Sequence, residues 1–420
     1  MPNEGGAMKL RGNRAAEAVM TLCLLALIAG AGCNRTPRLS LQTRIDRAEP
    51  GTTISIDPGT YRESLRIDKS IVLEGAGTGD DGSSIVGSVG GVATIAIEGD
   101  VQVAIRNLTI QSGVGGIAVR GGATLSLERV RILDSLGSGL SLGDSASATL
   151  GDCTINRSGR NGISISGAAS LVATACAIHE SEAVGIAAST RGTVRIENSS
   201  IENSGECGLE ILGGTVAELR HSDVVANGYA ETVRTILDGA AQSGLWLAGS
   251  SRTSVEECRL FDNRWIGILV DERAALTMQQ TEILACGGDG LLVDMAADVE
   301  LLDCVVGESG RFGISLWGAS HTELRATEIS QSDGAGVLVA GVADAELYGC
   351  RVIGNHGGGV LTFTPGCHEE AEDAMVFIGV LMGVGNEIPG PDEAFGNTGM
   401  ATCPEHLKGF LCRDSELSSD

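Results

Sequence analysis

The sequence predicts an all-β solenoid whose chain winds into coils of about 23 residues, with three short strands in each coil. The first observation is a glycine followed by an aliphatic residue, which recurs at this spacing on either side of one longer gap. It marks eleven coils, at Gly116, Gly139, Gly162, Gly185, Gly208, Gly244, Gly267, Gly290, Gly313, Gly336 and Gly359. Two residues after the first aliphatic residue the pattern is again almost wholly aliphatic, and this alternation indicates a strand with one buried side.

Two further aliphatic columns supply the second and third strand of each coil. The first contains Leu127, Leu150, Ala173, Ile196, Leu219, Val255, Met278, Leu301, Leu324 and Leu347. The second contains Ile132, Ile155, Ile178, Ile201, Val224, Leu260, Ile283, Val306, Ile329 and Val352. Successive coils then stack as parallel strands ~4.8 Å apart, which predicts a three-sheet prism with like residues on like.

The composition agrees with one long body of this kind. The chain has 420 residues, of which 61 are glycine and only 3% are aromatic, so stacked aliphatic side chains suit it better than a core of large rings. Its formal net charge of −25 opposes nucleic-acid binding, because proteins bind phosphates by neutralising them with Lys and Arg.

Residues 1–32 are expected to form an export signal. The apolar run that begins at Met20 is too short to span a membrane and has the length of a signal-peptide core. Its end, Gly-Ala-Gly-Cys, resembles the lipobox of bacterial lipoproteins, although Gly30 stands where an aliphatic residue is usual. The resemblance implies lipidation of Cys33, with residues 33–40 as a polar tether. The alternative is an ordinary secretory signal that leaves Cys33 unmodified.

Residues 41–100 are predicted to form an N-terminal cap and the first coils. Leu41 and Ile45 recur at helical spacing, Pro-Gly then ends the helix, and alternating strands begin at Ile54. This stretch resembles the N-terminal cap of the pectin lyase-like superfamily, whose members are right-handed parallel β-helices closed by a short amphipathic helix. The resemblance implies this fold and handedness. It leaves the chemistry open, because the superfamily includes lyases, hydrolases, esterases, epimerases and proteins with no known reaction.

Residues 101–363 are predicted to be the regular β-helix, interrupted by an insertion at 229–243, and residues 364–420 a C-terminal cap or tail. The last segment leaves the 23-residue period and contains Cys367, Cys403 and Cys412. In an exported protein, one disulfide among these three cysteines is expected.

Two inner columns are predicted to be structural. Small residues fill the first, which includes the five cysteines Cys153, Cys176, Cys258, Cys304 and Cys350. We expect these to be thiols that act as small hydrophobic groups, and we expect no tetrahedral metal site, because the six histidines are scattered. The second column holds Ser and Asn at a turn and predicts a hydrogen-bonded ladder.

The outward column of the glycine-led strands changes character beside the insertion. It contains Ala118, Ser141, Ser164, Ala187 and Glu210 before the insertion, and Trp246, Leu269, Leu292, Ser315, Leu338 and Leu361 after it. One interpretation is that the 229–243 loop folds over this apolar stripe. The other is that the stripe is an open binding floor.

Polar and aromatic residues are predicted to lie at both edges of this stripe. Asp271 and Asp294 share a column on adjacent coils, followed by Trp317, and Arg264, Trp265 and Arg311 stand at the opposite turn. Two stacked carboxylates repel, so the pair could keep a proton or bind a cation such as calcium. The candidate catalytic residues are therefore Asp271, Asp294 and Arg311, and the candidate ligand-binding residues are Trp246, Trp265, Trp317 and Arg264.

The predicted function is binding rather than catalysis. The Asn-Thr-Asp, Gly-His-Gly and Asp-Pro-His-Glu motifs of the superfamily's polygalacturonases and alginate epimerases are missing from the sequence. We expect an exported, monomeric protein that binds carbohydrate or cell-envelope material, anchored through Cys33 in the bacterial envelope, or periplasmic or secreted. The alternatives are a polysaccharide lyase, hydrolase or epimerase acting near the 229–243 loop, and a structural surface spacer.

Overall fold

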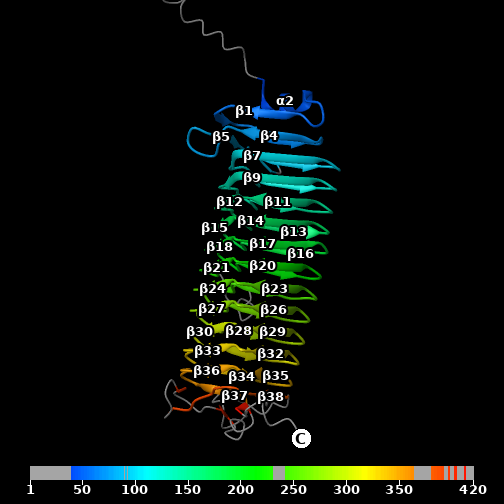
Figure 1. Ribbon diagram of the computed structural model, residues 1–420. Coiled ribbons are helices and arrows are strands. Elements are labelled where there is room, and N and C mark those ends of the chain that lie inside the picture. Colours follow the sequence, from blue (N-terminus) through cyan, green and yellow to red (C-terminus); the bar gives the residue numbers. More distant parts are fainter. Residues whose placement is uncertain are drawn as a thin grey trace, which may run out of the picture. The chain divides into compact units, whose positions relative to one another are not determined.

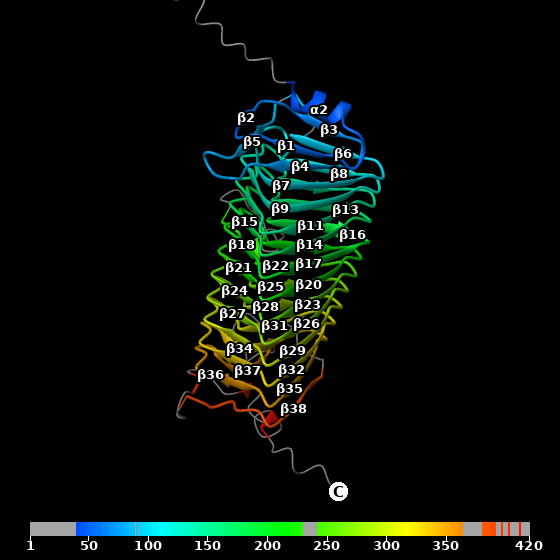
Figure 2. The ribbon, with the colours of Figure 1, turned by 45° about the horizontal axis from the view of Figure 1, so that its top comes forward.

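The computed structural model describes residues 39–88, 90–91, 93–229, 242–363, 380–391, 396–397, 402–403 and 411–412. Within the compact unit that begins at Leu41, the coils are stacked in the order of the sequence (Figure 1). Strands of successive coils lie directly beside one another, so each coil repeats the path of the one before (Figure 2). Three strand columns form three sides, which we call faces 1, 2 and 3.

Face 1 consists of the glycine-led strands, and all of its pairings are parallel. Its 14 strands extend the eleven predicted coils by two before β8 and one after β37. The strands are β3 (Leu65–Ile67), β6 (Ile95–Glu98), β8 (Ile117–Arg120), β10 (Leu140–Leu142), β13 (Ile163–Gly167), β16 (Ile186–Thr190), β19 (Leu209–Leu212), β22 (Leu245–Leu247), β25 (Ile268–Val270), β28 (Leu291–Val293), β31 (Ile314–Leu316), β34 (Ala335–Val339), β37 (Gly358–Thr362) and β39 (Thr402–Cys403).

Face 2 follows face 1 in each coil. It consists of β1 (Thr53–Ile56), β4 (Ile71–Gly75), the first parts of β7 (Gln102–Gln111) and β9 (Thr124–Leu133), β11 (Ser147–Gly151), β14 (Ser170–Thr174), β17 (Thr193–Glu197), β20 (Val216–Arg220), β23 (Arg252–Glu256), β26 (Ala275–Gln279), β29 (Asp298–Leu302), β32 (His321–Arg325), β35 (Asp344–Tyr348) and β38 (Leu381–Val384).

Face 3 completes the coil. It consists of β2 (Gly59–Tyr61), β5 (Ser83–Val86), the second parts of β7 and β9, β12 (Thr154–Asn156), β15 (Ala177–His179), β18 (Ser200–Glu202), β21 (Asp223–Val225), β24 (Arg259–Phe261), β27 (Glu282–Leu284), β30 (Val305–Gly307), β33 (Glu328–Ser330) and β36 (Arg351–Ile353). Because β7 and β9 continue from face 2 into face 3, these two faces form a single 25-stranded sheet.

The register confirms the 23-residue coil. Ile163 pairs with Ile186, and Ile186 pairs with Leu209. Across the insertion, Leu209 pairs with Leu245, so the ladder resumes on the same column of side chains. All three predicted aliphatic columns are buried, and the predicted all-β, parallel three-sided solenoid is confirmed.

The chain turns from one face to the next at single residues with a left-handed backbone. Asp152, Ala175 and Asn198 lie between faces 2 and 3 with φ of 50° to 54°, and Arg157 and Glu180 end face 3 with φ of 53° and 55°. Such a conformation costs a non-glycine residue about 1–2 kcal/mol. The sequence analysis missed these bends because most of the residues that make them are not glycine.

Helix α2 (Leu41–Arg47) caps the first coil, as predicted. Leu41 and Ile45 are buried in the core, whereas the basic residues of the helix face outward. The backbone N–H groups of Leu41 and Gln42 donate hydrogen bonds to the Glu63 carboxylate, at 2.9 and 3.1 Å. A carboxylate that accepts from the first free N–H groups stabilises a helix start, so Glu63 fixes the cap to the coil below.

The predicted Ser and Asn ladder forms only at its asparagines. The backbone N–H of Asn227 donates to Asn263 Oδ1 at 3.1 Å, and Asn263 Nδ2 donates to the Val224 carbonyl. The serine hydroxyls of the same column have no hydrogen-bond partner within the described residues, at Ser135, Ser158, Ser181, Ser204, Ser309 and Ser332. The serines therefore fill space beneath the face 1 glycines, and the prediction of a ladder was wrong for them.

The inward cysteines are free thiols, as expected. Cys153, Cys176, Cys258, Cys304 and Cys350 are all buried and unbridged. The predicted disulfide among Cys367, Cys403 and Cys412 lies outside what the structure describes, since Cys367 and the Cys403 side chain are not part of it. In the segment 364–420, β38 continues face 2 by parallel pairing with β35. In the same segment, β39 continues face 1 by parallel pairing with β37.

Candidate functional site

Face 1 is the outer surface on which the sequence predicted a site, and it has two different halves. In the first half, which runs from Ala118 to Ala187, the outward side chains are small and partly exposed. In the second half, from Leu269 to Leu361, most of them are buried: Leu269 is 6% exposed, Leu338 0% and Leu361 5%. The two halves share one backbone ladder, so their difference comes from the side chains and from what covers them.

A groove of about 430 Å³ crosses the first half of face 1. Ala118, Ser141 and Ser164 lie along its floor as neighbours on adjacent coils. Their small side chains leave the space that bulky residues would fill. Ser138 and Ser166 add hydroxyl groups at the two sides of the floor.

Two guanidinium groups line this groove from opposite ends of the strands. Arg120 ends β8, and Arg160 lies in the turn before β13, and both are exposed. Neither side chain makes an ion pair or hydrogen bond with any described residue, and no carboxylate lines the groove. The lining of this groove therefore carries two positive charges and no negative one.

The apolar edge of the groove consists of Leu136 and Val114. Leu136 is 62% exposed and Val114 38%, which is unusual for aliphatic residues in this chain. An apolar edge beside hydroxyl and guanidinium groups offers contacts to the carbon-bound hydrogens of a sugar as well as to its polar groups. The sequence analysis missed this groove. Its signal was the run of small outward residues at Ala118, Ser141 and Ser164.

The predicted carboxylate pair is present at the far edge of the second half. Val270 pairs with Val293, and this places the next residues, Asp271 and Asp294, side by side on adjacent coils. Partial burial raises the pKa of Asp271, and the charge of Asp294 raises it further. One oxygen of each carboxylate accepts a 2.6 Å hydrogen bond from the following backbone N–H, which leaves the second oxygens for other partners.

Arg311 does not join this pair. Its Nη1 lies 3.8 Å from Oδ1 of Asp289, at the opposite end of the face 1 strands. Asp289 is 2% exposed, and its Oδ2 accepts a 2.6 Å hydrogen bond from the Ser315 hydroxyl. Burial raises the pKa of Asp289 despite this hydroxyl and Arg311. The sequence analysis missed Asp289 because its column also contains Ile266 and Phe312.

The predicted aromatic ligand-binding residues lie in three separate places. Trp246 lies in the outward column between Glu210 and Leu269, with its indole nitrogen buried and unpartnered among the described residues. Trp317 packs against Phe363, with ring centroids 5.1 Å apart, in a small apolar cluster on the second half of face 1. A ring held in such a cluster has one side occupied, so Trp317 is less suited to stacking on a sugar.

Trp265 and Arg264 lie at the turn before β25. Trp265 is 38% exposed and lies over Gly288 of the next coil, where an added Cβ would meet the ring at 3.0 Å. The Arg264 guanidinium lies 5.6 Å from the ring centroid of Tyr229. The insertion itself, apart from its first and last residues, lies outside what the structure describes, so the question of what covers the apolar stripe stays a prediction.

Two findings on the described residues concern metal ions and membranes. Among the described residues there is no group of three or more His, Cys, Asp or Glu side chains placed to hold a metal ion. In the described part of the chain, no helix has the length and apolar character that a membrane-spanning segment needs. Cys33 and the rest of the predicted signal and tether through residue 38 are outside the described residues.

Solved structures of two polysaccharide epimerases and a glucanase are similar to this chain. The A-module of Azotobacter vinelandii mannuronan C-5 epimerase AlgE4 is 16% identical, with 86% of this chain and 93% of that one covered and a TM-score of 0.50. A variant of the periplasmic alginate epimerase AlgG is 13% identical, with coverage of 74% and 82% and a TM-score of 0.48. The catalytic domain of a GH87 alpha-1,3-glucanase is 11% identical, with coverage of 82% and 67% and a TM-score of 0.46.

Sequence comparison identifies the family. A search of curated proteins finds no match to this chain. The sequence model described as "Right handed beta helix region" matches residues 93–241 and 243–366, which is more than half of the chain. The stack of parallel strands agrees with this match, and the chain therefore belongs to the right-handed β-helix family.

Proposed function

We propose that the protein binds a carboxylate-bearing polysaccharide in the groove on the first half of face 1, without chemical conversion. The observation that supports this most is the pair of unpaired guanidinium groups, Arg120 and Arg160, on either side of a floor of serine hydroxyls. Arginine binds carboxylates through paired N–H donors, and such charge-assisted hydrogen bonds are about twice as strong as neutral ones.

The lining of the groove favours binding over catalysis. Sugar conversion by general acid and base requires two titratable groups within reach of the reacting atoms. The groove lining contains arginine, serine, glycine and aliphatic residues and no Asp, Glu, His or Tyr. A polymer held there would meet groups that bind and orient it, and none that exchange protons near neutral pH.

The test is a binding titration of the full chain with uronate oligosaccharides and with neutral oligosaccharides of equal length. The double variant Arg120→Ala/Arg160→Ala should weaken uronate binding at least tenfold, which is about 1.4 kcal/mol. Arg191→Ala is the matched control, since Arg191 is also exposed and without an ion pair but lies outside the groove. Equal binding by the double variant and the wild type, or equal affinity for neutral chains, would refute the proposal.

The second candidate function is a polysaccharide-active enzyme at the carboxylates of face 1. It is favoured by the raised pKa of Asp271 next to Asp294, and by that of Glu210, which burial and then the charge of Glu206 raise. Calcium is the cation we would add to the pair. Turnover of uronate polymers, measured with and without calcium, should then be lost in Asp294→Asn. No turnover under any of these conditions would exclude this candidate.

We further propose that the chain is exported and anchored by a lipid on Cys33. The support is the short apolar run that ends in Gly-Ala-Gly-Cys, where the cysteine would follow the cleavage site. Metabolic labelling with a radioactive fatty acid should mark the wild type and leave Cys33→Ala unlabelled. Labelling of both variants, or of neither, would contradict the anchor.

A further inference from the structure

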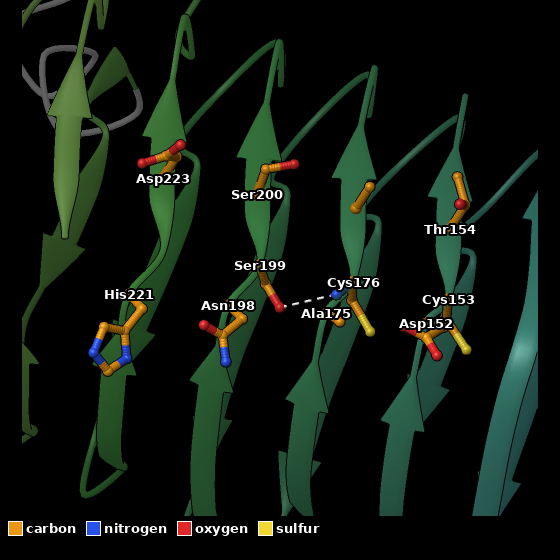
Figure 3. Close-up of a pocket in the computed structure, with 11 residues that line it drawn as sticks. Asp152, Cys153, Thr154, Ala175, Cys176, Asn198, Ser199, Ser200, His221 and Asp223 are labelled. Carbon is orange, nitrogen blue, oxygen red and sulfur yellow. Dashed lines mark hydrogen bonds between the residues drawn. The ribbon is translucent and has the colours of Figure 1, made fainter. Parts of the chain in front are cut away.

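A second groove lies at the bend between faces 2 and 3 and crosses four successive coils. It has a volume of about 600 Å³, and Figure 3 shows the residues that line it. Each coil contributes a bend residue and the strand residue two positions later, and all of these side chains are exposed or partly exposed. In chain order they are Asp152 and Thr154, Ala175 and Ala177, Asn198 and Ser200, and His221 and Asp223.

The second of these four coils contributes only methyl groups. Ala177 pairs with Thr154 on one side and with Ser200 on the other. Ala175 makes the bend of the same coil, with φ of 54°. The strands of the first and third coils are about 9.6 Å apart, which is twice the strand spacing of ~4.8 Å. The two alanines therefore form the floor of a gap between polar side chains, which we call the notch.

Four polar side chains beside the notch have no hydrogen-bond or ion-pair partner among the described residues. Two lie on the coil before the alanines and two on the coil after them: Asp152, Thr154, Asn198 and Ser200. Carboxylate, amide and hydroxyl oxygens all accept hydrogen bonds. No Lys or Arg lines the groove. The notch therefore offers acceptors on both sides, and a negative charge on one of them.

The nearest arginine of the bend column does not compensate this charge. Arg129 makes the equivalent bend of the coil before Asp152. Its guanidinium donates to Asn107 Oδ1 at 2.8 Å and pairs with the Glu128 carboxylate. Asp152 thus keeps its full charge toward the groove.

The far end of the groove is already satisfied by ion pairs. His221 lies 3.2 Å from the Glu257 carboxylate. The Arg259 guanidinium donates to both oxygens of Asp223, at 2.9 and 2.6 Å. A charged ligand therefore has its free partner at the other end, next to the notch.

We propose that the notch binds an amino sugar in its ammonium form. An ammonium group donates three hydrogen bonds, and Asp152 with the neighbouring Thr154 hydroxyl accepts them. The alanine methyls contact the carbon-bound hydrogens of the ring, and Asn198 and Ser200 contact its hydroxyl groups from the third coil. A uronate is disfavoured here, because its charge would repel Asp152. The inference goes beyond the groove on face 1, whose arginines select the opposite charge.

The experiment is a calorimetric titration of the full chain with glucosamine oligomers at mildly acidic pH, where their amino groups are protonated. N-acetylated oligomers of the same length are neutral and should bind about tenfold more weakly. Asp152→Asn keeps the shape and removes the charge, so it should weaken glucosamine binding about tenfold. Asp303→Asn is the matched control, since Asp303 is an exposed bend residue with the same φ of 51° as Asp152 but lies outside the groove.

A second variant tests the notch itself. Ala177→Leu fills the notch from a partly exposed position, so glucosamine binding should be lost while the urea unfolding midpoint stays close to that of the wild type. Uronate binding should be unchanged in both variants, which separates a failure of this proposal from a failure of the groove on face 1.

Three results would overturn the proposal. The first is equal glucosamine binding by the wild type and Asp152→Asn, or an equal loss in Asp303→Asn. The second is equal affinity for the N-acetylated oligomers. The third is equal affinity for putrescine, a linear diamine without hydroxyl groups, because the chain would then recognise positive charge alone.

Discussion

The two halves of face 1 have the same backbone and opposite surfaces. From Ala118 to Ala187 the outward residues are small and border an open groove, and from Leu269 to Leu361 most are buried. The ladder of parallel pairs runs through both halves without a shift of register. The inward columns therefore determine the fold, and the outward column is free to determine what each stretch of surface does.

Magnitudes explain why one half is covered and the other is open. Burying a leucine side chain contributes about 1.5–3 kcal/mol to stability. Residues that cover Leu338 and Leu361 therefore stabilise the fold by several kcal/mol. Burying Ser141 or Ser164 offers no such gain and costs free energy unless each hydroxyl finds a partner. A cover over the first half would be destabilising, and the groove stays accessible to a ligand.

The largest expected effect is a charge placed in each half. Leu338→Asp should destabilise the fold by about 3 kcal/mol or more, because it buries an unpaired carboxylate. Ser141→Asp should change stability by less than about 0.5 kcal/mol, since that position faces the groove. Urea unfolding midpoints check both variants. Similar midpoints for the two variants would remove the distinction between the halves.

The turn column inside the same coils should show the next largest effect. Asn263→Ala should cost about 2 kcal/mol, because it leaves the Asn227 N–H buried without its acceptor. Ser181→Ala should change stability by less than about 0.5 kcal/mol, since its hydroxyl has no partner among the described residues. Thermal unfolding of both variants measures the contrast, and a large loss in Ser181→Ala would reveal a hydrogen bond that the structure lacks.

A smaller and pH-dependent effect is expected at Asp289, in the second half. The pKa of Asp289 is raised in the folded state from its ordinary value of 3.8. Just above pH 3.8 the native state therefore binds more protons than the unfolded state. The free energy of unfolding then falls as the pH rises through the folded pKa. Asp289→Asn should therefore be more stable than the wild type at pH 7, with the gain disappearing near pH 3. A loss of stability at pH 7 would mean that the contact with Arg311 outweighs burial.

The smallest effect on stability should come from making the first half resemble the second. Ser141→Leu fills the groove with a side chain of the kind found at Leu292 and Leu338, and its unfolding midpoint should stay close to that of the wild type. Binding of uronate oligosaccharides should nevertheless be lost, because the leucine occupies the groove floor. A variant that binds normally would show that the ligand lies elsewhere.

The fold could be predicted from sequence because aliphatic residues recur at fixed distances. The same register correctly placed Asp271 next to Asp294, since residues 23 apart become neighbours in the stack. The bends were missed because left-handed residues such as Arg157 and Glu180 have no compositional mark. The ladder failed at the serines because their hydroxyls in this column find no partner among the described residues, whereas the Asn263 amide bonds to Asn227 and Val224.

The site was less predictable because exposure depends on the whole molecule. Nothing in the repeat distinguishes Leu338, which is fully buried, from Leu292 in the same column, which is partly exposed. The sequence placed Arg311 correctly at the turn opposite Asp271 and Asp294, but its contact with Asp289 could not be foreseen, because Asp289 lies in a column that otherwise contains apolar residues. Arg120 and Arg160 could not be singled out from the sequence, because only the structure shows which charged groups lack a counterion.

Because successive coils have the same number of residues, coils could be added to this chain by engineering or evolution. Because Ile163, Ile186 and Leu209 follow one another at whole-coil intervals, duplicating 23 residues would insert one layer and leave every other layer unchanged. The solenoid can thus be lengthened by one coil at a time, and a coil added in the first half of face 1 would bring one more floor position to the groove in which we propose that polysaccharide binds. Deleting a fraction of a coil would instead turn the hydrophobic side of every later layer outward.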